Sequence, residues 1–139
     1  MRTPHSCERQ LGGANCEGCE CSSVRTFETG ATRDQDERKH DLEGFLSPFV
    51  LREFGGYMHE HRIQRDGSLR TSDNWQQGIP LDAYMKSAWR HFMDWWSVHR
   101  GLKVEDFDGE PVDVRVALCA LLFNVQGYLH ELLRRETLR

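Results

Sequence analysis

The chain contains no apolar run long enough to cross a membrane and no signal segment at its start. Its first ten residues, MRTPHSCERQ, are mostly polar, and no stretch reaches the roughly 18 apolar residues that a membrane span needs. Excess positive charge is also absent, since the formal net charge is −4 at pH 7. These absences predict a cytoplasmic protein that neither crosses a membrane nor binds nucleic-acid backbones through its net charge.

Convincing β-strand patterns are absent as well, and only four prolines interrupt the 139 residues. Apolar residues instead recur at helical spacing near residues 47–61, 80–101 and 111–139. The sequence therefore predicts an all-α fold, a bundle of three to five helices, within residues 41–139. Residues 24–40 are polar and predict a linker, and residues 1–23 form a separate cysteine-rich segment.

Cysteines are concentrated at the start of the chain. Four of the five lie in the first 21 residues: Cys7, Cys16, Cys19 and Cys21. In a chain without a secretion signal, this clustering favours a metal site over disulfides. The four thiolates could hold a structural Zn²⁺ tetrahedrally, with His5 as a substitute ligand. The alternative is a reduced tail without a metal. Cys119, within VALCALLF, is expected to be a buried small hydrophobe.

All four tryptophans lie between Ser72 and Gly101. In the helix expected from Pro80 onward, apolar and aromatic residues share one face and charged residues share the other. The residues of this aromatic stripe are Met85, Ala88, Trp89, Phe92, Trp95, Trp96 and His99. Because apolar residues at helical spacing are usually packed, we expect the stripe to form the core. Trp75, in the preceding loop, is either a plug over the core or a platform on which a ring stacks.

Carboxylates occur in two places where they could hold a hard cation. Glu53 and Glu60 lie two turns apart on one flank of the first long helix, where they converge if they face inward and are solvated if they face outward. Glu105 and Asp106 belong to an acidic run before Pro111, which is either solvated or a Mg²⁺ ligand set.

Two further features have open interpretations. Arg62, Arg65 and Arg70 form a basic loop that either faces a phosphate or is solvated. Asn124 interrupts the apolar run of the last helix, so it either ties helices together or faces a pocket.

Five short motifs follow one another in a specific order. They are Asp41 and Leu42 after a basic residue; Glu53 with Tyr57; NWxxG at Asn74, Trp75 and Gly78; RHxxxWW at Arg90, His91, Trp95 and Trp96; and an acidic run at Glu105, Asp106 and Asp108. Between about residue 39 and residue 133, this order resembles that of bacteriophage dATP/dGTP diphosphohydrolases, which are similar to the all-α, MazG-like nucleotide pyrophosphohydrolases. The resemblance implies a Mg²⁺-dependent enzyme, in the cytoplasm of an infected host cell, that cleaves purine dNTPs to a monophosphate and pyrophosphate.

The resemblance also suggests roles for individual residues. Glu53, Glu60, Glu105 and Asp106 would be the catalytic residues that hold Mg²⁺. Arg90 would pair with phosphate oxygens, beside His91 at the border of the helix face. Trp75 would stack on the purine, and Asn74 or Asn124 would read its edge. A homo-oligomer is expected, since MazG-like domains generally bury apolar helices by dimerising.

The chain departs from the MazG-like pattern in its acids. Those enzymes hold Mg²⁺ with an ExxE motif on one helix and an ExxD motif on another, and neither appears cleanly here. Alanines near Ala117 and Ala120 also occupy positions where the related phage proteins often have histidines. These departures favour an alternative function, a zinc-containing module that binds a nucleotide or a protein without catalysis. Whether Glu53 meets the pair Glu105 and Asp106 distinguishes the two hypotheses.

Overall fold

The computed structural model describes residues 23–35 and 39–138. The chain divides into two compact units, residues Met1–Asp41 and Leu42–Arg139. The four cysteines of the predicted zinc site, Cys7, Cys16, Cys19 and Cys21, lie outside the described residues. The Zn²⁺ site therefore stays a prediction.

The first unit contains a small antiparallel hairpin, formed by β1 (Ser23–Thr26) and β2 (Thr32–Gln35). Gly30 adopts a φ of 81° in the turn, and its N–H donates to the Phe27 carbonyl at 2.9 Å. The prediction of a fold without strands is therefore wrong in this stretch, and the assignment of residues 24–40 as a polar linker stays a prediction. Two short runs containing Val and Thr, joined by a glycine turn, pair with each other although neither carries the alternating pattern of a longer strand.

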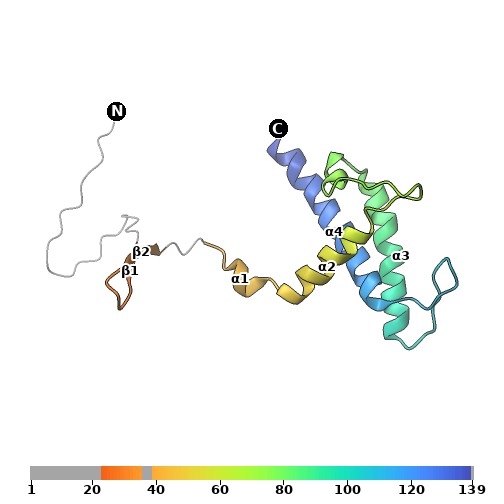
Figure 1. The fold of residues 1–139 in the computed structure, drawn as a ribbon, viewed down its shortest axis with the longest axis horizontal. Coiled ribbons are helices and arrows are strands. Elements are labelled where there is room, and N and C mark those ends of the chain that lie inside the picture. Colours follow the sequence, from red (N-terminus) through yellow and green to blue (C-terminus); the bar gives the residue numbers. More distant parts are fainter. Residues whose placement is uncertain (1–22, 36–38, 139) are drawn as a thin grey trace. The chain divides into compact units, whose positions relative to one another are not determined.

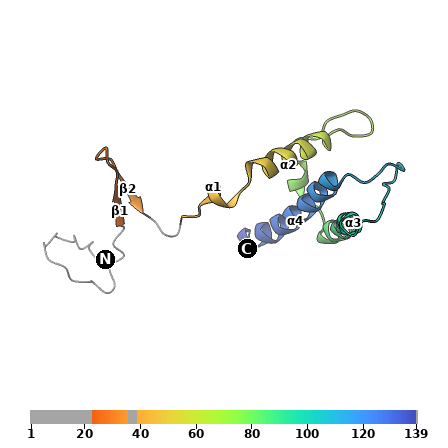
Figure 2. The same ribbon diagram turned by 90° about the horizontal axis from the view of Figure 1, so that it is seen from below.

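The second unit is helical, which confirms the predicted helical character. Its elements are α1 (Leu42–Phe45), α2 (Pro48–Glu60), the 3₁₀ turn η1 (Asn74–Gln77), α3 (Leu81–His99) and α4 (Val114–Thr137). Helix α4 runs through the middle of the unit. Helix α3 packs along it, and α2 and η1 contact it elsewhere (Figures 1 and 2). Helix α4 is therefore the element against which α2, α3 and η1 all pack.

Local sequence signals set the helix ends. The Ser47 hydroxyl accepts from the Val50 N–H at 3.4 Å, with Pro48 in the first turn of α2, as the sequence predicts. Helix α3 ends before Gly101, whose φ is 79°. Helix α4 begins three residues after Pro111, because the Asp113 carboxylate accepts from the Arg115 N–H at 2.8 Å.

The core lies between α3 and α4. Its buried apolar side chains are Tyr84, Ala117, Cys119 and Ala120, so the prediction that Cys119 is buried is confirmed. Gly127, also buried, carries no side chain at all. Small residues on this face of α4 allow α3 to approach closely.

The aromatic stripe of α3 does not form the core, so that prediction is wrong. Trp89 is 60% exposed and Trp96 is 49% exposed, and His99 is exposed as well. The side of α3 that packs carries Tyr84 and His91 instead. The small side chains of α4 pack against the side of α3 that carries Tyr84, which leaves most of the aromatic stripe facing away from the core. The stripe residues contact one another, with the rings of Trp89 and Phe92 6.0 Å apart.

Helix α4 is long and apolar enough to cross a membrane by length and composition, with a mean hydropathy of 1.4 over its 18-residue window. This finding differs from the expectation that no stretch of the chain is apolar enough for a membrane span, and 33% of the window is buried within the described structure.

Candidate functional site

A cavity of about 620 Å³ lies between α3, the loop of residues 101–113 and the start of α4. Its lining includes four residues singled out from the sequence: Arg90, His91, Glu105 and Asp106. Its size falls in the range of about 300–1,000 Å³ that small-molecule sites occupy. The structure therefore brings half of the predicted catalytic set together with two of the predicted substrate-binding residues.

The acidic loop is held in place by its own hydrogen bonds. The Val112 N–H donates to the Val104 carbonyl at 2.9 Å, which pairs the two sides of the loop. One carboxylate oxygen of Asp106 accepts from the backbone N–H groups of Asp108, at 2.9 Å, and Glu110, at 3.0 Å. Asp106 therefore shapes the loop as well as lining the cavity.

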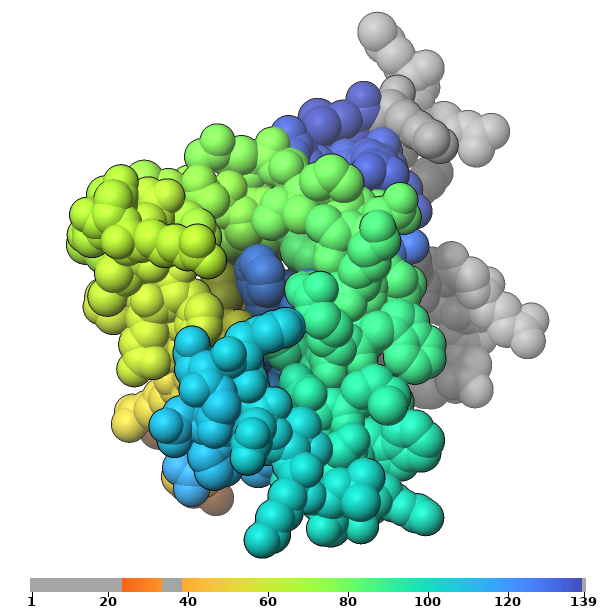
Figure 3. Space-filling view, turned by 90° about the vertical axis from the view of Figure 1, so that its right-hand side faces the viewer, coloured from red at the N-terminus to blue at the C-terminus, as the bar shows by residue number. Residues whose placement is uncertain are grey.

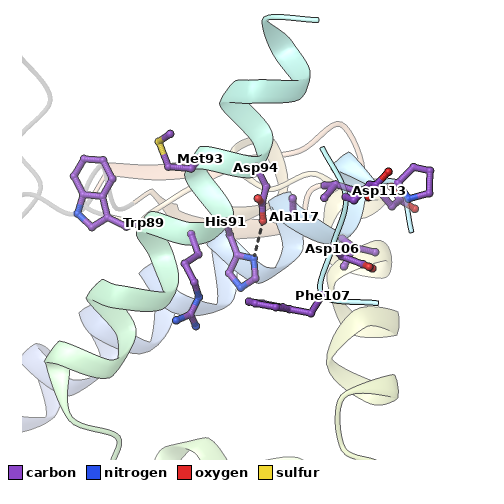
Figure 4. A pocket seen from close by; sticks show the side chains of 13 residues that line it. Trp89, His91, Met93, Asp94, Asp106, Phe107, Asp113 and Ala117 are labelled. Atoms are coloured by element: carbon purple, nitrogen blue, oxygen red, sulfur yellow. Dashed lines mark ion pairs between the residues drawn. The ribbon is translucent and has the colours of Figure 1, made fainter. Parts of the chain in front are cut away.

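His91 sits on the cavity wall beside Asp94, with a distance of 3.9 Å between the imidazole Nδ1 and the carboxylate. Figure 4 shows both side chains pointing from α3 toward the loop that carries Phe107, while Trp89 lies on the other side of the helix. Burial lowers the pKa of His91, and the nearby Arg90 and His61 lower it further, against the opposing effect of Asp94. The neutral imidazole is thereby favoured, which suits a proton acceptor.

Phe107 is a residue of this site that the sequence reasoning did not single out. Its side chain is fully exposed at the tip of the acidic loop and lines the same cavity as His91. The sequence does contain a signal for Phe107: it is an aromatic residue within an acidic loop, where a ring is expected to be exposed and to have no role in packing. Such a ring offers a face on which a base can stack.

Glu53 and Glu60 line a different cavity, of about 190 Å³, which also contains Arg52 and Arg115. The four predicted catalytic carboxylates are therefore divided between two cavities. Glu53 does not share a cavity with Glu105 and Asp106, which is the arrangement expected of the non-catalytic module. Within residues 23–35 and 39–138, no three His, Cys, Asp or Glu side chains gather as a group that could hold a metal ion. Binding of Mg²⁺ stays a prediction.

Asn74 and Trp75 line a third cavity, of about 200 Å³, together with residues from the end of α2 and the loop after it. The Trp75 ring also meets the rings of His130, at 4.9 Å between centroids, and Phe123, at 6.2 Å. Trp75 thus packs on α4 as a plug and at the same time forms a cavity wall. Figure 3 shows the hollow on this face, bordered by α2, α3 and the two loops, with α4 visible at its floor.

Asn124 does not behave as either sequence interpretation expected. It is buried, and its side-chain amide donates to the Ala120 carbonyl of its own helix at 2.7 Å. It lines none of the three cavities. The hydrogen bond therefore satisfies the buried amide within α4.

Comparisons with protein families, curated proteins and solved structures find no match for this chain. The function is therefore inferred from the chemistry of the cavities and from the motifs in the sequence.

Proposed function

We propose that the helical unit is a MazG-like, Mg²⁺-dependent phage enzyme that hydrolyses a purine deoxynucleoside triphosphate to the monophosphate and pyrophosphate. The observation that carries the proposal is that Arg90, His91, Glu105 and Asp106 line one cavity of suitable size. Arg90 and His91 belong to one motif of the sequence resemblance, and Glu105 and Asp106 belong to another. The two pairs are 15 residues apart along the chain and line the same cavity.

Each residue has a role that its position supports. The Arg90 guanidinium is oriented by its hydrogen bond to the Ser87 hydroxyl, at 2.8 Å, and would pair with phosphate oxygens. The His91 imidazole, favoured in its neutral form, would take the proton of the attacking water. The exposed Phe107 ring would stack on the purine.

The donor set at this cavity fits a hard divalent cation. Mg²⁺ is usually held by one or two carboxylates, with substrate phosphates and water as the remaining ligands. Glu105 and Asp106 supply two carboxylates beside the proposed phosphate-binding Arg90. When bound, the cation would neutralise phosphate charge and favour attack by water. Glu53 and Glu60, in their separate cavity, have no part in this site.

A second candidate is a module that binds the nucleotide without cleaving it. The observation that favours it is that one Asp106 oxygen is already engaged by two backbone N–H groups, which weakens it as a cation ligand. In that case the same cavity would bind the purine nucleotide, and the cysteine segment would supply a structural Zn²⁺.

The decisive experiment incubates the purified full chain with Mg²⁺ and each dNTP and measures pyrophosphate release. We expect release from dATP or dGTP that is abolished by a chelator and reduced at least about a hundredfold by Glu105→Gln. Glu110→Gln, in the same loop but outside the cavity lining, is the matched control and should retain activity. Binding of dATP without release would favour the binding module. Folded protein that shows neither binding nor release would overturn both candidates.

The unit also exposes an apolar face that fits a second copy of itself. On α4, Leu118, Leu122, Val125, Leu129 and Leu132 follow each other at spacings of four, three, four and three residues, and each is between 38% and 54% exposed. This is the seam spacing at which helices pack knobs into holes. The seam lies on the side of α4 away from Ala117 and Ala120, which face α3. We therefore propose a homodimer in which the α4 helices pack together.

A further inference from the structure

The cavity between the end of α2, residues 61–72 and η1 carries a concentration of positive charge. Arg62, Arg70 and His61 all line it. Among the residues that line it, none is Asp or Glu, although the chain as a whole has a net charge of −4. A cavity of this composition selects an anion.

A short hairpin holds the backbone of both arginines and the side chain of Arg62. The Arg70 N–H donates to the Arg62 carbonyl at 2.9 Å, and the Arg62 Nε donates to the Arg70 carbonyl at 2.7 Å. The turn itself is fixed by Asp66, whose carboxylate accepts from the Ser68 N–H at 2.9 Å. The second bond uses only Nε of the Arg62 fork, so both Nη groups can serve a ligand in a fixed orientation.

The His61 ring is also held in a fixed orientation. Its Nδ1 lies 2.8 Å from the Tyr57 carbonyl, and its ring stacks on the Tyr57 ring at 3.9 Å between centroids. Since a carbonyl can only accept, Nδ1 carries a proton, and Nε2 donates to an anion in the imidazolium form, in which both ring nitrogens carry a proton. The hydroxyl groups of Thr71 and Ser72 on the cavity wall add neutral donors.

We infer that this cavity binds a phosphate or pyrophosphate group through Arg62, Arg70 and His61. Its volume of about 200 Å³ is below the range of whole small-molecule sites, so it suits a small anion or the phosphate end of a larger ligand. This placement rests on the proposed function: the outer phosphates of the nucleotide would bind in this cavity, and its base would lie near Phe107.

The anion cavity and the larger cavity are neighbours. His61, which lines the anion cavity, contributes to the lowered pKa of His91, which lines the larger cavity. Figure 3 shows the face of the unit that is hollowed over α4, between the elements that carry the two cavities. A nucleotide lying along this hollow would place its phosphates between Arg90 and the arginines of the hairpin.

Calorimetric titration of the full chain with inorganic pyrophosphate, without Mg²⁺ and at fixed ionic strength, tests the anion site. We expect binding that Arg70→Gln weakens about tenfold or more, because a charge-assisted pair with the anion is lost. Arg65→Gln removes the same charge from the same hairpin but not from the cavity lining, and it should change the affinity less than about twofold. Circular dichroism checks that both variants keep their helical content.

No pyrophosphate binding by the folded wild-type chain, or equal weakening in the two variants, would overturn the inference. Titration with dATP and with deoxyadenosine separates this result from the proposed function. If dATP is hydrolysed while Arg70→Gln binds and cleaves it normally, the anion site is refuted and the enzyme stands. If pyrophosphate binds through Arg70 but no dNTP is cleaved, the anion site stands and the enzyme is refuted.

Discussion

The ring of Tyr84 occupies the space that a side chain at Gly127 would need. A Cβ atom built on Gly127 would overlap the Cε1, Cζ and Oη atoms of Tyr84. Tyr84 is the most completely buried large side chain described, at 1% exposed, and it also meets the Phe123 ring at 5.9 Å between centroids. The packing of α3 on α4 therefore depends on the absence of a side chain at Gly127. Because His91 and Arg90 belong to α3, their placement depends on this packing as well.

Replacing Gly127 by alanine is therefore expected to destabilise the protein. The added methyl group must displace a buried ring, at a cost of about 1–3 kcal/mol in the free energy of unfolding. Urea unfolding measures the change. Gly55→Ala is the matched control, since a Cβ there would meet nothing within 4 Å, and it should stabilise α2 by up to about 1 kcal/mol. Equal effects of the two substitutions would contradict the packing described.

The same pair of glycines shows what the sequence could and could not predict. Two glycines within a helix, such as Gly55 and Gly56, suggest the close approach of another backbone or of a ligand, and in the described structure no protein atom approaches either of them. Gly127 does admit a close neighbour, the ring of Tyr84, and nothing in the sequence around it indicated this. Helix periodicity and caps depend on nearby residues and could be predicted, but which faces meet depends on shapes far apart in sequence.

The exposed aromatic stripe of α3 illustrates the same limit. Periodicity correctly separated its apolar face from its charged face, and then assigned the wrong face to the core. In the site, two residues of the motif RHxxxWW, Arg90 and His91, line the large cavity. The sequence grouped Glu53 with Glu105 because both are acids in motifs, and only tertiary packing decides that they line separate cavities.

Stability should fall as the pH drops below about 6.5, because of His91. Burial lowers its pKa in the folded protein, whereas in the unfolded chain it titrates near about 6.5. Below that pH the unfolded chain takes up a proton that the folded protein does not, so the free energy of unfolding decreases until the folded pKa is reached. Urea unfolding across this range should show a slope that is reduced in His91→Gln. His99→Gln, an exposed residue of the same helix, should keep the wild-type slope.

The α4 seam should control the oligomeric state. Leu122 and Val125 lie at its centre, 38% and 54% exposed. We expect Leu122→Lys to weaken a dimer at least about tenfold, since a charge would be buried in an apolar interface. Light scattering coupled to size exclusion, over a series of concentrations, measures the dissociation. Leu51→Lys, on the exposed side of α2, is the control and should remain dimeric. A wild-type chain that stays monomeric at every concentration would refute the seam.

Phe107 should determine the affinity for the base and leave the chemical step largely intact. Its ring is fully exposed at the tip of a loop that is pinned by Asp106, so its removal alters no packing in the described structure. Phe107→Ala should raise KM for the preferred dNTP about tenfold, since stacking on a base contributes about 1–3 kcal/mol, with a much smaller change in kcat. Phe107→Trp should restore KM. Phe49→Ala removes an equally exposed ring from α2, at 86% exposure, and should leave both constants unchanged. If Phe107→Ala lowers kcat and leaves KM unchanged, the ring acts on the loop that holds Glu105, and the base binds elsewhere along the hollow.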